Sequence, residues 1–186
     1  PKPAPTCPLP EESLQTLARD LREDPSRDLE YPLLERAFEA ARSEGSERLR
    51  PLLLELHDLL ELRGLYDAAQ DLLERAAPSL DPEDRAGEIQ GLLGGLDLRR
   101  GRFPQALERL RDAARRAREA GREDLEIPSL FHLGLAAMYA GEGAEARDTL
   151  RIASGRCLLL RDPRWEGYGL NALGFLAQEL GDYPQA

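Results

Sequence analysis

This 186-residue chain has only two histidines and two cysteines, while its 35 aspartates and glutamates are too many, and expected to be too exposed, to nominate an acid–base pair. His57, Asp58 and Glu61 share one face of an expected helix. One imidazole with two carboxylates is a weak indication of a metal site, and His57 is better explained as a packing residue. Cys7 and Cys157 have neither metal-ligand spacing nor the density of a disulfide framework. Cys157 fits best as a small apolar residue.

The common sequence motifs of enzymes are missing as well. The chain contains no Gly-x-x-x-x-Gly-Lys phosphate loop, no Gly-x-Ser-x-Gly nucleophile elbow and no His-Glu-x-x-His zinc motif. The glycine-rich residues 91–95 follow no strand, so they predict close helix packing rather than a phosphate site. We therefore expect a protein that is not an enzyme and that holds no metal and no cofactor.

Charge gives a further candidate surface. Residues 99–122 hold nine arginines against three acidic residues. Four of these arginines form one stripe of an expected helix: Arg111, Arg115, Arg118 and Arg122. The stripe is interpreted either as a docking surface for an acidic partner or another protomer, or as a solvated face neutralised by pairs such as Asp112–Arg116. The net charge of −10 argues against direct binding to nucleic acid or to an anionic membrane.

Composition indicates which elements must position these side chains. Leucine occurs 37 times, valine is absent, and isoleucine and threonine together occur six times. Strands need β-branched and aromatic residues, whereas Leu, Ala, Glu and Arg favour helices, so we expect an all-α fold. Apolar spacing predicts helices over residues 29–44, 46–63, 66–77, 83–100, 103–120, 124–140, 144–160 and 164–180. No apolar run reaches the roughly 18 residues of a membrane-spanning helix.

A short signature recurs at intervals of 37, 40 and 40 residues. It consists of a glycine, an aromatic residue two positions later in three of four copies, and an alanine five positions later. The copies begin at Gly64, Gly101, Gly141 and Gly181. Glycine permits the positive-φ turn that ends one helix, the aromatic ring fills the space under the turn, and alanine lets two helices approach closely.

Matching positions recur on both helices around each of these alanines. Twelve residues before the alanine lie His57, Gly94, Gly134 and Gly174, each preceded by leucine. Four residues after it lie Leu73, Leu110 and Leu150, and seven residues after it lie Ala76, Ala113 and Ala153. The pattern predicts that each small residue of a first helix contacts the second helix of its pair.

This pattern resembles the tetratricopeptide repeat (TPR) family, with Leu-Gly on the first helix and Gly-x-aromatic-x-x-Ala at the turn. The period is longer than the family's usual 34 residues, as in TPR regions of bacterial signalling and regulatory proteins. Residues 11–45 look like a degenerate first repeat, in which Tyr31, Leu34, Phe38 and Ala41 match Phe103, Ala106, Leu110 and Ala113.

The resemblance implies antiparallel helix pairs stacked in a right-handed superhelix, an α-solenoid, over residues 11–186. Full repeats would occupy about residues 46–82, 83–122 and 123–162, with an incomplete repeat at 163–186. Residues 1–10, which include five prolines, are expected to be a linker or a disordered N-terminus.

In TPR arrays the first helices line a concave groove, and carrying the family's groove positions over gives a set of candidate binding residues. They are Leu98, Arg99, Phe131, Leu135, Met138, Tyr139, Tyr168, Asn171, Phe175 and Gln178. Several are aromatic or apolar, which suits a peptide with apolar anchors. A second interpretation is that these aromatic residues pack between repeats.

The resemblance therefore implies a non-catalytic module that binds a protein or peptide partner, as the sensing or scaffolding part of a bacterial, cytoplasmic signalling or transcription-regulatory protein. Two alternatives stay open. One is a homo-oligomerisation module that associates through an open C-terminal end. The other is the regulatory domain of an enzyme whose catalytic part lies outside these residues.

Overall fold

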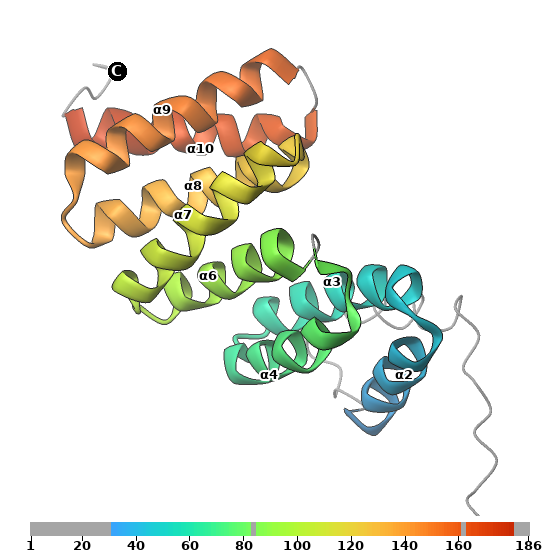
Figure 1. Cartoon of the computed structure of the whole chain (residues 1–186). Coiled ribbons are helices and arrows are strands. Elements are labelled where there is room, and N and C mark those ends of the chain that lie inside the picture. Colours follow the sequence, from blue (N-terminus) through green and yellow to red (C-terminus); the bar gives the residue numbers. More distant parts are fainter. Residues whose placement is uncertain (1–30, 83–84, 161–162, 181–186) are drawn as a thin grey trace, which may run out of the picture. The chain divides into compact units, whose positions relative to one another are not determined.

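The computed structural model describes residues 31–82, 85–160 and 163–180, and the chain divides into two compact units (Figure 1). The first unit extends to Asp81 and the second starts at Pro82. The first contains α2 (Tyr31–Glu44), α3 (Ser46–Leu62), α4 (Tyr66–Ala76) and a 3₁₀ turn (Ala77–Ser79). The second contains a π-helical turn (Arg85–Ile89), α6 (Gln90–Arg99), α7 (Phe103–Glu119), α8 (Glu123–Tyr139), α9 (Gly143–Leu160) and α10 (Pro163–Leu180).

Every regular element in these described ranges is helical, which confirms the predicted all-α fold class. Most observed boundaries lie within one or two residues of the predicted ones. The exception is the helix predicted over residues 83–100, which begins as the π-helical turn before α6 continues it. Four glycines between positions 87 and 95 weaken the helical preference of this stretch. Residues 1–10 and the predicted first half-repeat before Tyr31 lie outside the described residues.

The signature glycines form the turns that the repeat predicts. Their φ angles are 70° at Gly64, 71° at Gly101 and 81° at Gly141. In each turn the next N–H donates to the carbonyl five positions earlier, as from Leu65 to Leu60 at 2.9 Å. This bond is typical of the Schellman motif, in which a left-handed glycine closes the helix. The prediction is confirmed at these three turns, and the fourth copy, at Gly181, lies outside the described residues.

Close packing within helix pairs follows the predicted positions. On α4, α7 and α9, the signature alanine and the leucine and alanine that follow it by four and seven positions are all buried, and none of them is more than 1% exposed. Gly94 faces Leu110 and Gly134 faces Leu150, so tightly that a Cβ on Gly134 would lie 2.5 Å from Leu150 Cγ. His57, which takes the glycine position on α3, is buried. The predicted contacts of the small residues on α6 and α8 are therefore confirmed.

Within each unit, each α-helix packs on its neighbour in the chain. In the first unit α3 contacts both α2 and α4. In the second unit α7 packs between α6 and α8 and α9 between α8 and α10, while α8 also contacts α6 and α10. The helix α8 thus contacts both α6 and α10, and these three helices carry all ten candidate binding residues.

No helix within the described ranges is both long enough and apolar enough to cross a membrane.

Candidate functional site

Three of the four aromatic residues predicted for the groove gather between α8 and α10. The Phe131 ring meets Tyr168 edge-on at a centroid distance of 5.2 Å and lies 6.4 Å from Phe175. Phe131 is only 7% exposed and shares a core cluster with Leu150 and Leu176. Its side chain therefore joins α8, α9 and α10 and offers little surface to a partner.

The remaining candidate residues differ in exposure. Leu98 is buried, and Leu135 and Met138 are half-buried against the cluster that contains it. Arg99, Tyr139 and Asn171 are exposed. The side chain of Gln178 lies outside the described part of the chain. These candidates thus give the surface of α6, α8 and α10 a cation, a phenol and an amide beside two half-buried apolar side chains, and α10 also exposes Leu170 and Leu173.

Tyr139 is held in place although 57% of it is exposed. Its ring stacks on Phe103 at a centroid distance of 5.6 Å and an interplanar angle of 18°. Phe103 packs in turn against the cluster around Leu110 and Leu133. An aromatic side chain that is exposed yet already ordered loses little conformational entropy on binding, which makes Tyr139 a suitable anchor.

Residues 91–95 bring α6 close to α8. A Cβ on Gly91 would lie 3.1 Å from Ser129 Oγ, and one on Gly95 would lie 3.7 Å from His132 Nδ1. These glycines serve close helix packing, as the sequence predicts, and the contact includes a hydroxyl and an imidazole.

The arginine stripe is neutralised by carboxylates of the same unit. Arg111 pairs with Glu142 and Glu145 on the α9 side, and hydrogen bonding to Glu145 raises the pKa of Arg111. The other three pair as follows: Arg115 with Asp112 and Glu119, Arg118 with Glu126, and Arg122 with Asp124. The predicted Asp112–Arg116 pair is present at 2.7 Å. This pairing is the arrangement that the solvated-face interpretation describes.

Glu126 is a charged residue that sequence reasoning missed. It is 2% exposed, and its two carboxylate oxygens accept bonds from Arg118 and Arg156, each at 2.7 Å. Because the two arginines come from α7 and α9, the carboxylate links three successive helices. A single glutamate within the apolar residues 125–131 was the signal in the sequence, but its partners are distant along the chain.

His57 has the packing position that the sequence assigns to it. Its Nδ1 lies 3.4 Å from the Asp58 carboxylate, and its Nε2 is buried. Within the described ranges, no three His, Cys, Asp or Glu side chains are grouped so that they could hold a metal ion.

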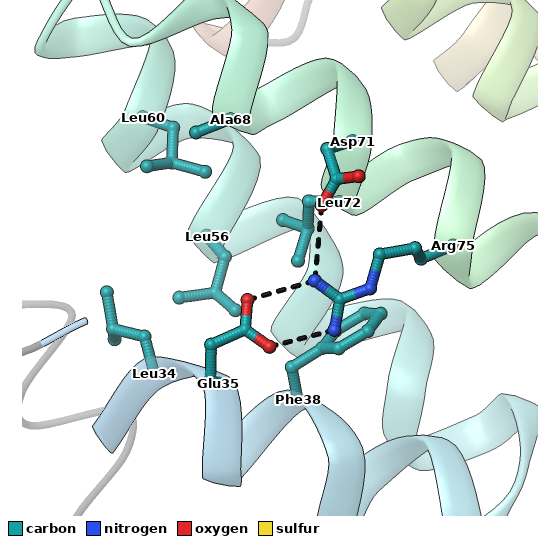
Figure 2. A pocket seen from close by; sticks show the side chains of 9 residues that line it. All are labelled: Leu34, Glu35, Phe38, Leu56, Leu60, Ala68, Asp71, Leu72 and Arg75. Atoms are coloured by element: carbon teal, nitrogen blue, oxygen red, sulfur yellow. Dashed lines mark hydrogen bonds and ion pairs between the residues drawn. The ribbon is translucent and has the colours of Figure 1, made fainter. Parts of the chain in front are cut away.

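A hollow in the first unit, which we call the α2–α4 pocket, was not predicted (Figure 2). Its apolar lining comes from all three helices: Leu34, Phe38, Leu56, Leu60, Ala68 and Leu72. Its polar lining consists of Glu35, Asp71 and Arg75. The volume is about 440 Å³, open mouth included.

Arg75 of α4 spans the mouth of this pocket. Its guanidinium donates to both oxygens of Glu35, at 2.9 and 2.8 Å, and lies 4.9 Å from the centre of the Phe38 ring. It also pairs with Glu39 at 2.8 Å and with Asp71 at 3.2 Å. The hydrogen bond from Arg75 lowers the pKa of Glu35. The pKa of Glu39 is also lowered, mainly by its hydrogen bond with Arg42 and less by the one with Arg75. Figure 2 shows the guanidinium between Glu35 and Asp71.

Replacing Glu35 by glutamine is expected to lower the free energy of unfolding near neutral pH by up to about 1 kcal/mol, because this pair is half exposed. Glu35 has its pKa lowered from 4.5 in the folded state. The carboxylate therefore stabilises the fold above that value and loses its effect as the pH falls through the folded pKa. Urea unfolding of both proteins from neutral pH down to about pH 3 measures this. If the difference in unfolding free energy between the two proteins stayed constant over the whole pH range, the pairing of Glu35 with Arg75 would be contradicted.

Comparison with protein-family models and with curated proteins finds no match for this chain.

Proposed function

We propose that the chain is a TPR-like helical-repeat module that binds a protein or peptide partner and performs no catalysis itself. The observation that carries the proposal is one contact made twice in the same register, Gly94 on Leu110 and Gly134 on Leu150. A helix pair of this kind buries its apolar face only by stacking on the next pair, and such arrays present extended surfaces to partners. The corresponding cellular role is sensing or scaffolding in a bacterial signalling or transcription-regulatory protein.

The surface that we assign to the partner is that of α6, α8 and α10. Arg99, Tyr139 and Asn171 supply exposed polar contacts there, and the half-buried Leu135 and Met138 supply apolar ones. Phe131, Tyr168 and Phe175 support this surface by packing α8 against α10. An extended or helical peptide with apolar anchors fits such a mixture, since an amide such as Asn171 can bond a peptide backbone.

A peptide selected by display against the whole chain tests this proposal. We expect the Tyr139→Ala/Asn171→Ala chain to bind the selected peptide at least about tenfold more weakly, because exposed aromatic anchors dominate binding energy. The matched control is Ile152→Ala/Leu158→Ala, which also removes two exposed side chains but from α9. Fluorescence anisotropy gives the affinities, and urea unfolding confirms that each variant is folded. Equal weakening by both double variants would overturn the assigned surface.

A further inference from the structure

The α2–α4 pocket belongs wholly to the first unit, whereas the surface assigned above belongs to the second. Its base is apolar and well fixed: Phe38 is fully buried, and Leu56, Leu60 and Leu72 are each at least 94% buried. Its enclosed volume is about 70 Å³, far below the roughly 300–1,000 Å³ of small-molecule sites. The pocket therefore suits one side chain of a larger partner better than a whole small molecule.

The internal repeat shows how this pocket differs from the matching place in the second unit. When Tyr31 and Phe38 are matched to Phe103 and Leu110, Glu35 of α2 falls at the position of Leu107 of α7. Leu107 is 4% exposed and fills the core between its neighbours. In the first unit the glutamate instead extends its carboxylate to Arg75. The leucine that packs into the core of the second unit is thus replaced in the first unit by a glutamate that pairs with Arg75.

The charged residues at the mouth of the pocket indicate which charge an incoming residue should carry. The polar lining has two carboxylates, Glu35 and Asp71, against the single guanidinium of Arg75. Glu39, the third carboxylate on Arg75, also pairs with Arg42. Asp71 meets Arg75 through one oxygen at 3.2 Å, and its side chain is 66% exposed. A cationic group approaching the mouth would find a surplus negative charge there.

We propose that the α2–α4 pocket binds an aliphatic side chain of a partner protein that carries a cationic residue next to it. The aliphatic group enters the space beside Phe38, Leu56 and Leu72, and the neighbouring cation pairs with Asp71 at the rim. The apolar contact supplies the affinity, and the charge selects against acidic neighbours. This site is independent of the surface of α6, α8 and α10, so either can fail without the other.

Three blocked dipeptides are the probes: acetyl-Leu-Arg-amide, acetyl-Leu-Glu-amide and acetyl-Ala-Arg-amide. Titration of the whole chain, followed by the NMR shifts of the Leu56, Leu60 and Leu72 methyl groups, gives an affinity for each. We expect Leu-Arg to bind saturably. Leu-Glu should bind about fivefold more weakly, because its carboxylate is repelled by the negative rim. Ala-Arg should bind at least about tenfold more weakly, because alanine leaves the pocket unfilled. Equal affinities for Leu-Arg and Leu-Glu, or no saturable shift at these methyl groups, would overturn the proposal.

Two variants complete the test. Glu35→Leu places in α2 the residue that α7 uses at the same position, so the chain should fold and Leu-Arg binding should be lost. Asp71→Asn keeps the space and removes one rim charge, so it should weaken Leu-Arg binding severalfold and leave Leu-Glu binding unchanged or stronger. If Glu35→Leu fails to fold, Asp71→Asn decides. An unchanged preference for Leu-Arg over Leu-Glu in Asp71→Asn would contradict the assignment of Asp71.

Discussion

Replacing Gly134 by alanine is expected to lower the free energy of unfolding by about 1–3 kcal/mol, the usual cost of overpacking a core. A Cβ there would lie 2.5 and 2.7 Å from side-chain atoms of Leu150 and 3.4 Å from its backbone nitrogen. Leu150 is fully buried, so it has little freedom to move aside. The helix pair α8–α9 would have to separate.

Gly155 provides the matched control, because it also lies inside a helix of the second unit and a Cβ there meets nothing within 4 Å. Alanine at an exposed helical position stabilises by about 0.5–1 kcal/mol relative to glycine. Urea unfolding followed by circular dichroism should therefore give shifts of opposite sign for the two variants. If Gly134→Ala proved as stable as Gly155→Ala, the close contact between α8 and α9 would be refuted.

Truncating Phe131 to alanine is expected to destabilise the chain by about 3–5 kcal/mol, the range for a buried aromatic residue. Phe131 is only 7% exposed, and its ring holds Tyr168 and Phe175 of α10 against α8. Its loss leaves a cavity where three helices meet. Aromatic contacts of this geometry add to the cost beyond their buried area.

Tyr139→Ala, on the same helix, should change the free energy of unfolding by less than about 1 kcal/mol, because most of its ring is exposed. The same unfolding measurement separates the two residues. A Phe131→Ala chain as stable as the wild type would mean that the ring belongs to a binding surface and not to the core.

The repeat made the helices and their turns predictable. Gly64, Gly101 and Gly141 each end a helix with positive φ, because only glycine adopts that conformation at low cost and the signature marks it. The burial of Leu73, Leu110 and Leu150 followed from the same register. The turns and the buried leucines depend on residues close in sequence, so the spacing of these residues along the chain is enough to predict them.

The candidate site was less predictable, for physical reasons. An aromatic residue at helical spacing, such as Phe131, has the same pattern whether it faces a partner or a neighbouring helix. Glu126 depends on arginines that only the fold brings to it. The α2–α4 pocket is lined by residues of three helices, and the pairing of Glu35 with Arg75 at its mouth joins residues 40 positions apart.

The most direct test of the proposed binding module is methyl NMR of the chain with the display-selected peptide. We expect saturable, one-to-one shifts at Leu135 and Met138 of α8. We expect no shifts at Ile152 and Leu158, which are exposed on α9. Shifts at the α9 methyl groups with none at Leu135 and Met138, or failure of any selected peptide to bind more tightly than its scrambled form, would contradict the account.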